Sequence, residues 1–264
     1  MGCLLSKIIA VCNQKGGVGK TTTAINIAAS LAVAEHKTLL VDMDPQCNAT
    51  TGVGIDKRSI EFSMYEIITN RKKGEKRLSL SDIILPSSQI KYFYIAPSST
   101  DLAAGELELV NVIAREKRLK EAIETVRNDY KYIIIDSPPS LGLLTINVLA
   151  AADSVLIPIQ CEYYALEGLA ELLNTIRLVQ KNLNTKLAIE GALLTMYDGR
   201  LNLSKQVVED VRTCFSGKVF STVITRNVKL SEAPSFGKPI LLYDVMSSGA
   251  ENYLNLAKEI MHNG

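Results

Sequence analysis

The sequence of 264 residues predicts a three-layer α/β/α fold, in which helices cover both faces of a mostly parallel β-sheet. Short apolar segments of strand length alternate along the chain with longer segments whose apolar residues recur at helical spacing. The strand segments are apolar at nearly every position, which is typical of parallel strands buried on both faces. Because this alternation is uninterrupted, we expect a single domain over residues 1–264.

The individual elements are expected in a regular order. The expected strands are 7–13, 38–41, 132–135, 154–159, 188–195 and 219–224. The expected helices are 21–35, 107–127, 166–179 and 250–261. The charged segment 71–77 is expected to be a solvated loop, because runs of charge usually face water.

Composition limits the possible functions. Hydrophobic residues make up 47% of the chain and the formal net charge is only +1, so any contact with nucleic acid must come from a local basic patch. The five cysteines include no C-x-x-C pair, and with two histidines they give no spacing for structural zinc. Unpaired thiols without a secretory leader lead us to expect a cytoplasmic protein.

Membrane attachment is not expected. No apolar run approaches the ~18 residues that a membrane-spanning helix needs. The first six residues, MGCLLS, fit the loose pattern for N-myristoylation, but we interpret them as a short apolar lead-in to the first strand.

A glycine-rich segment between the first strand and the first helix predicts a phosphate-binding loop. Glycines let backbone N–H groups turn inward around phosphate oxygens, and the helix that follows directs its positive end at the same anion. Lys20 can reach the terminal phosphates, and the Thr21 hydroxyl can ligate Mg²⁺. The predicted nucleotide-binding residues of this loop are Lys15, Gly16, Gly17, Val18, Gly19, Lys20, Thr21 and Thr22.

This loop departs from the ordinary P-loop at its beginning. Gln14 stands where the common pattern has its first glycine, and Lys15 follows it. The variant resembles the deviant Walker A loop of the ParA, Soj and MinD ATPases, the nitrogenase iron protein and the arsenite-pump ATPase. The resemblance implies a P-loop NTPase fold, and it implies that Lys15 reaches across a homodimer to the partner's nucleotide. A lysine supplied in this way would couple ATP binding to dimerisation, because a triphosphate needs more compensating charge than one lysine and Mg²⁺ provide.

Three aspartates follow two of the expected strands. Carboxylates at the carboxyl ends of parallel strands lie beside the nucleotide crevice of such sheets. Asp136 fits a Walker B acid that holds Mg²⁺ through water. The resemblance implies that Asp42 also supports the metal and that Asp44 positions the attacking water, so Lys15, Lys20 and Asp44 are the predicted catalytic residues.

Adenine is the expected base. The chain lacks the N/T-K-x-D run with which many GTPases recognise guanine. The segment 224–235 resembles the adenine loop of Soj, in which an asparagine, here Asn227, contacts the base. Thr225 stands where that family usually has proline, and we include both residues in the predicted nucleotide site.

Within this superfamily the partition ATPases of the ParA/Soj type fit best. The resemblance covers nearly the whole chain and includes DPQ at 44–46, NAT at 48–50, SPPSL at 137–141, QCEYYALEG at 160–168 and PSFGKPI at 234–240. A MinD-like, membrane-associated cell-division ATPase is the alternative, but the last helix has no cationic amphipathic face. An iron–sulfur carrier would need cysteines soon after Asp136, and a metabolic ligase would need a substrate pocket that the sequence does not reveal.

The resemblance implies an ATP-dependent switch in chromosome or plasmid partition. It implies Mg²⁺-dependent hydrolysis of ATP to ADP and phosphate, a homodimer on ATP binding, and a ParB-like DNA-binding partner. The loop begins at Lys15, so we expect no N-terminal operator-reading domain. Contacts with DNA should therefore be non-specific and made to phosphates, and the protein should be associated with the nucleoid. Residues 195–239 carry seven basic and four acidic side chains. Among them Arg200 and Lys229 fall where Soj-type proteins have DNA-contacting arginines.

Overall fold

The computed structural model describes residues 6–73, 76–162, 168–215 and 217–262. Its centre is a seven-stranded sheet of strand order β5-β6-β2-β7-β1-β8-β9, in which only the edge strand β5 runs antiparallel to its neighbour. The strands are β1 (Lys7–Val11), β2 (Thr38–Asp42), β5 (Leu85–Pro86), β6 (Phe93–Ala96), β7 (Tyr132–Asp136), β8 (Ser154–Gln160) and β9 (Ala188–Thr195). The mostly parallel sheet that the sequence predicts is confirmed.

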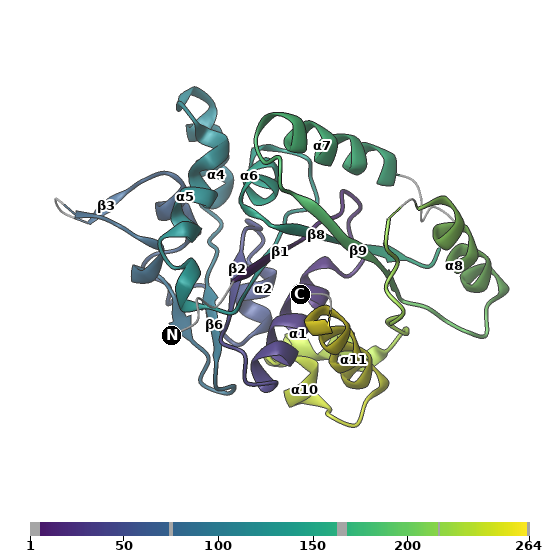
Figure 1. Ribbon diagram of the computed structural model, residues 1–264. Helices are drawn as coiled ribbons and strands as arrows, with labels where there is room; N and C mark the ends of the chain where they lie inside the picture. The colour runs from purple at the N-terminus through teal and green to yellow at the C-terminus, as the bar shows by residue number, and fades with distance from the viewer. Residues whose placement is uncertain (1–5, 74–75, 163–167, 216, 263–264) are drawn as a thin grey trace.

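Helices lie on both faces of this sheet (Figure 1). The α-helices are α1 (Lys20–Val33), α2 (Asn48–Gly52), α3 (Met64–Ile68), α4 (Leu102–Glu108), α5 (Arg118–Glu124), α6 (Leu143–Ala151), α7 (Leu169–Asn182), α8 (Asn202–Cys214), α9 (Val228–Glu232), α10 (Ile240–Tyr243) and α11 (Ser248–His262). Single 3₁₀ turns are Leu80–Asp82, Leu109–Asn111, Arg115–Lys117, Arg127–Asp129 and Ala233–Phe236.

Alternate residues of the strands supply two separate hydrophobic cores. In β1, Ile8 and Ala10 pack into the core under α3, α5, α6 and α7, whereas Ile9 and Val11 pack against α1 and α11. The period of two follows from strand geometry, and it explains why the strands are apolar at nearly every position. The three-layer arrangement follows directly from this pattern.

Two expected elements are wrong. The expected helix 107–127 is divided into α4, α5 and two 3₁₀ turns, because Val112 is extended and Ala114 has a left-handed backbone with φ of 56°. Ile113, which the helical pattern placed on a buried face, is 92% exposed. The expected strand 219–224 makes only isolated bridges next to β9. Its middle amides, those of Ser221 and Thr222, donate instead to the carboxylate of Glu259 in α11.

Smaller differences concern segment ends. The expected loop 71–77 contains a short antiparallel pair, β3 (Lys72–Lys73) and β4 (Lys76–Arg77), which the amide of Leu78 extends by donating to the carbonyl of Arg71. The expected helix 166–179 is described from Leu169 onward as α7, and its first residues lie outside the described residues. The same holds for 163–167 of the QCEYYALEG run and for residues 1–5 of the N-terminal segment.

Candidate nucleotide-binding and catalytic site

The central strands bring the phosphate loop and the acidic residues to one edge of the sheet. Asp136, the last residue of β7, is the register partner of Val11 in β1 and of Asp42 in β2. The loop leaves the sheet directly after Val11. The carboxyl ends of neighbouring parallel strands meet at this edge, which is where ligands bind in open α/β sheets.

The loop 12–19 has the geometry of a phosphate cradle. Gly17 and Gly19 adopt left-handed conformations, with φ of 75° and 87°, that other residues reach only with strain. A Cβ atom on Gly16, Gly17 or Gly19 would meet no heavy atom within 4 Å among the described residues, so the space in front of the loop is open. Helix α1 begins at Lys20, directly behind the loop.

The side chain of Lys20, the first residue of α1, is bonded to the backbone of the loop 12–19. Its Nζ donates to the carbonyl oxygen of Lys15 at 2.9 Å, and only 6% of the residue is exposed. Burial lowers the pKa of Lys20, while the nearby Asp136 acts in the opposite direction. The ammonium group therefore lies against the cradle and has only one hydrogen-bond acceptor among the described residues.

Side chains that the sequence pattern did not reveal fix the loop from behind. The Thr195 hydroxyl, at the end of β9, donates to the carbonyl of Val18 at 2.9 Å. The Ser137 hydroxyl donates to the carbonyl of Val11 at 2.9 Å. Asn13 accepts from the amide of Lys15 and donates to the carbonyl of Pro158 at 2.6 Å. Apart from the local bond between Asn13 and Lys15, these bonds join residues that are far apart in the sequence, and no local motif indicates them.

Asp136 is a buried carboxylate whose oxygens make no hydrogen bond at hydrogen-bonding distance within the described part of the chain. Its exposed fraction is 0%, and neither oxygen has a hydrogen-bond partner among the described residues. Burial raises the pKa of Asp136 well above its ordinary value and the charge of Asp42 raises it further, while the Thr21 hydroxyl acts in the opposite direction. A buried polar group without a partner costs free energy, so such a group in a native structure requires an explanation.

Asp42 is equally buried but fully bonded. Its Oδ2 accepts from the Thr50 hydroxyl at 2.7 Å and from the Thr50 amide at 2.8 Å, and its Oδ1 accepts from the Asp44 amide at 3.1 Å. Burial raises the pKa of Asp42 to about 6, and the hydrogen bonds from Thr50 partly offset this effect. Asp44 lies in the turn after β2, where its Oδ1 accepts from the amide of Gln46 at 3.0 Å.

The described residues contain no group of three or more His, Cys, Asp or Glu side chains that could hold a metal ion by themselves. A hard cation at this edge would take its remaining ligands from phosphate and water, which is how Mg²⁺ is commonly bound. Asp136 fits such an ion, because its two oxygens lack partners and Thr21 lies close by.

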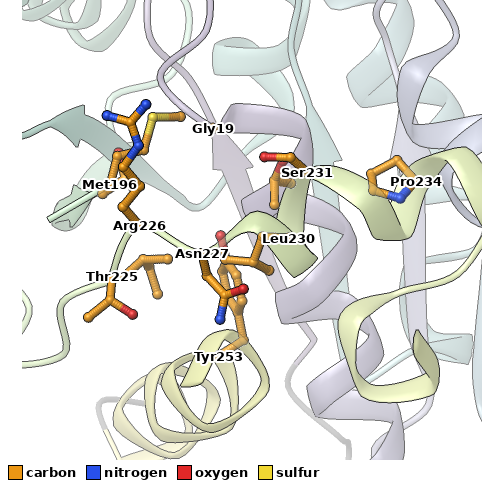
Figure 2. A pocket seen from close by; sticks show the side chains of 12 residues that line it. Gly19, Met196, Thr225, Arg226, Asn227, Leu230, Ser231, Pro234 and Tyr253 are labelled. Atoms are coloured by element: carbon orange, nitrogen blue, oxygen red, sulfur yellow. The ribbon is translucent and has the colours of Figure 1, made fainter. Parts of the chain in front are cut away.

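A pocket of about 280 Å³ opens beside the loop (Figure 2). Gly19 and Thr22 line it from the loop and the first turn of α1, and Thr225 and Asn227 line it from the segment between β9 and α9. The structure thus brings together the two parts of the predicted nucleotide site, which are widely separated in the sequence. The side-chain amide of Asn227 donates to the Ser248 hydroxyl at 2.9 Å, and its oxygen accepts from the amide of Lys229, so the side chain is fixed.

The pocket has further walls, and part of them belongs to the segment 224–235 that the sequence already indicates: Ile224, Arg226, Leu230, Ser231 and Pro234. Sequence reasoning does not reveal Thr195, Met196 and Tyr253, which complete the lining. Tyr253 belongs to the hydrophobic core beside α11, and only 1% of the residue is exposed. Its hydroxyl contacts the Thr23 hydroxyl at 3.1 Å, which joins α11 to α1 under the pocket. The helical spacing of Tyr253 in α11 carries no signal for this second role.

The two predicted DNA contacts lie outside the pocket, and each is paired with an acid. Arg200 makes two hydrogen bonds to the carboxylate of Asp198, at 2.9 and 2.6 Å, while its side chain is 88% exposed. Lys229 forms an ion pair with Glu232 at 3.1 Å. Exposed ion pairs of this kind are weak, so both cations stay available to a polyanion.

Known proteins resemble the chain over nearly its full length. A family model described as an AAA domain matches residues 6–189. The sporulation initiation inhibitor protein Soj of Bacillus subtilis is 58% identical over 98% of this chain and 100% of its own length. The chromosome partitioning protein ParA of Myxococcus xanthus is 55% identical over 97% of this chain and 88% of its own length. The chain belongs to the Soj/ParA family of P-loop ATPases. This confirms the family that the deviant loop predicts.

A solved structure agrees with the Soj/ParA fold. Cobyrinic acid a,c-diamide synthase from Mycobacterium smegmatis, with a bound ATP analogue and magnesium, matches with a TM-score of 0.85 and 34% identity. The match covers 98% of this chain and 95% of that chain. The P-loop NTPase fold class is therefore confirmed. Within the described part of the chain, every helix is too short or too polar to cross a membrane.

Proposed function

We propose that this protein is an ATP-driven dimerising switch that binds DNA non-specifically and acts in chromosome or plasmid partition with a ParB-like partner. The observation that carries the proposal is the meeting of Lys15, Lys20, Asp42, Asp44 and Asp136 at one edge of the sheet, in a chain 55% identical to a chromosome partitioning ParA. We favour partition over the synthesis of a cobyrinic acid diamide, because the chain is 55% identical to the partitioning ParA but only 34% identical to the synthase. Purified protein should hydrolyse ATP in the presence of Mg²⁺, and hydrolysis should respond to DNA.

The phosphates of ATP would lie in the open space before Gly16, Gly17 and Gly19, against loop amides and the first turn of α1. Lys20 would exchange the carbonyl of Lys15 for a phosphate oxygen, which gives its buried ammonium group a charged partner. Lys15, half-buried at the beginning of the loop, would reach the nucleotide of the second protomer.

Thr21, Asp136 and Asp42 would support Mg²⁺. Bound Mg²⁺ would neutralise charge on the phosphates during transfer. Asp136 would accept hydrogen bonds from water in the metal shell, which supplies the partners that its two oxygens lack. Asp42 would keep its bonds to Thr50 and contribute negative charge from behind.

Asp44 would orient the attacking water. Its Oδ1 is occupied by the amide of Gln46, whereas the described residues give its Oδ2 no hydrogen bond. An oxygen in that state, at a residue 5% exposed beside the phosphate cradle, can accept a hydrogen bond from water. Positioning is a large part of catalysis in phosphoryl transfer.

The pocket between the loop and the segment 224–234 would hold the adenosine part of ATP, with Asn227 and Thr225 nearest to the base. Thr225 is not free to move, because its amide and hydroxyl both bond the Asn252 oxygen in α11. The base site is thus tied to the last helix.

DNA would be held by Arg200 and Lys229 from both protomers of the ATP-bound dimer, in the cytoplasm at the nucleoid. One patch with a small excess of positive charge binds a duplex weakly, and dimerisation doubles its phosphate contacts. The same proposal includes a single domain over residues 1–264. It also includes a surface of this domain that binds the ParB-like partner.

A MinD-like membrane role is the alternative, and α11 argues against it. An amphipathic membrane anchor needs an apolar face that can leave the protein. In α11 the apolar residues Tyr253, Ala257 and Ile260 are all buried against α1 and the sheet. Binding to anionic liposomes but not to DNA would favour the alternative.

A further inference from the structure

Two buried hydroxyl groups connect the predicted metal-supporting and water-positioning aspartates. The Thr50 hydroxyl donates to Oδ2 of Asp42 at 2.7 Å and accepts from the Ser98 amide at 3.0 Å. The Ser98 hydroxyl donates to the backbone carbonyl of Asp44 at 2.8 Å. Thr50 and Ser98 are both 0% exposed.

We propose that Thr50 and Ser98 are positioning residues that set the catalytic geometry of Asp44. This inference rests on the proposed role of Asp44 in orienting the attacking water. The two hydroxyls act through the turn after β2, and neither needs to contact ATP.

The bonds fix the Asp44 backbone on both sides. Its amide donates to Oδ1 of Asp42, whose other oxygen is held by Thr50, and its carbonyl accepts from Ser98. Each end of the residue is therefore tied to a buried group on a different segment. What remains adjustable is the side chain, of which one oxygen is bonded to the Gln46 amide and the other has no hydrogen bond from the described residues.

The segment that carries Ser98 is itself well anchored. The neighbouring Ser99 hydroxyl accepts from the Ser63 hydroxyl at 3.0 Å, and Ser63 forms the capping box of α3 with Glu66. The carbonyl of Pro97 accepts from the amide of Met64 at 2.8 Å. Ser98 thus ties the Asp44 turn to a segment whose neighbouring residues are bonded to the beginning of α3.

A role of Thr50 in packing alone and a positioning role of its hydroxyl predict different effects of substitutions on turnover. If Thr50 only packed, valine, which has nearly the same shape, would replace it without loss of turnover. If its hydroxyl positions Asp42 and Asp44, then serine should replace it and valine should not. Small displacements of catalytic groups are costly, because an error of roughly 1 Å can reduce the rate by roughly 100-fold.

The test measures kcat and KM for Mg-ATP in the full-length variants Thr50→Val, Thr50→Ser and Ser98→Ala. Thr51→Val is the matched control, because Thr51 is the next residue of α2 and, among the described residues, its hydroxyl bonds only the carbonyls of Cys47 and Asn48. Thermal melting of each nucleotide-free variant reports folding. Wild type and Asp44→Ala are measured in parallel as references for the proposed function.

We expect Thr50→Val and Ser98→Ala to lose at least about tenfold in kcat with KM within about twofold of wild type. Thr50→Ser and Thr51→Val should stay near wild-type kcat. If folded Thr50→Val and Ser98→Ala turn over like wild type while Asp44→Ala is inactive, the inference is wrong and the role of Asp44 stands. If Asp44→Ala is as active as wild type, the proposed function fails instead. Should Thr50→Val not fold, Ser98→Ala against Thr51→Val decides the question.

Discussion

Asp42 and Asp136 are register partners on adjacent strands, and both are completely buried with raised pKa values. They differ in one respect. Asp42 has three hydrogen bonds from Thr50 and Asp44, whereas Asp136 has none from the described residues. The bonded aspartate ends β2 directly before the turn that carries Asp44, and the unbonded one lies close to Thr21 in the first turn of α1. This asymmetry leads to the first prediction.

Asp136→Asn should stabilise the nucleotide-free protein and abolish Mg-dependent hydrolysis. The substitution removes a buried unbonded charge, so the free energy of unfolding should rise by about 1–3 kcal/mol. Because the pKa of Asp136 is raised in the folded state, Asp136 lowers the free energy of unfolding increasingly as the pH rises. This loss grows between the ordinary aspartate pKa of 3.8 and the raised pKa of the folded state. The gain should therefore be larger at neutral pH than at a pH of about 4. Urea unfolding at both values checks it, and an unfolding free energy below wild type at neutral pH would contradict it.

Asp44→Ala should bind ATP but lose at least about 100-fold in kcat, because an unoriented water attacks poorly. The variant should accumulate as an ATP-bound dimer, which sedimentation can detect. Gln46→Ala serves as a control, because the amide that Gln46 donates to Asp44 belongs to the backbone. Hydrolysis at the wild-type rate would remove Asp44 from the mechanism.

Lys15→Ala should abolish ATP-induced dimers while each monomer still binds nucleotide. We expect the loss of dimers because the substitution removes a positive charge that would compensate the triphosphate of the second protomer. Lys20→Ala should instead weaken ATP binding itself, because Lys20 lies in the loop of its own protomer. Lys186→Ala, an exposed change at the opposite edge of the sheet, is the control. Normal ATP-dependent dimers of Lys15→Ala would mean that Lys15 is only a loop residue.

Asn227→Asp should weaken ATP binding by about 2- to 10-fold, which corresponds to the removal of one hydrogen bond. The aspartate still caps α9, since the capping atom is the side-chain oxygen that accepts from Lys229. Melting without nucleotide should therefore stay near wild type, and the ATP-induced shift in melting temperature should shrink. Asn182→Asp, at the end of α7, is the control for an added negative charge. If ATP raises the melting temperature of Asn227→Asp and Asn182→Asp by the same amount, the base does not contact Asn227.

The fold and the phosphate loop could be predicted because their signals are local. The strand 7–11, the left-handed glycines and the helix from Lys20 follow one another in sequence, and each has a direct physical cause. Asp136 and Asp42 were predictable for a related reason, since strand ends in a parallel sheet gather at one edge.

What could not be predicted depends on contacts between distant segments. Thr50, Ser98 and Thr195 gain their roles from partners 8 to 177 residues away. The break of the expected helix at Ala114 likewise leaves the apolar periodicity intact while the backbone turns. Periodicity reports which residues are apolar, and it does not report where the chain bends.

The central claim is that ATP creates a dimer that holds DNA without regard to sequence. The most direct measurement is a salt series of binding isotherms on two unrelated duplexes, with ATP or ADP, in the Asp44→Ala background. We predict tight binding only with ATP, equal affinity for both duplexes, and affinity that falls steeply with salt. Arg200→Ala and Lys229→Ala should each lower the salt slope by about two, because each substitution removes one phosphate-neutralising cation from each protomer of the dimer. Asp198→Asn should strengthen binding, because it frees Arg200 from its ion pair. Equal binding with ADP and ATP, or strong preference for one duplex, would contradict the account.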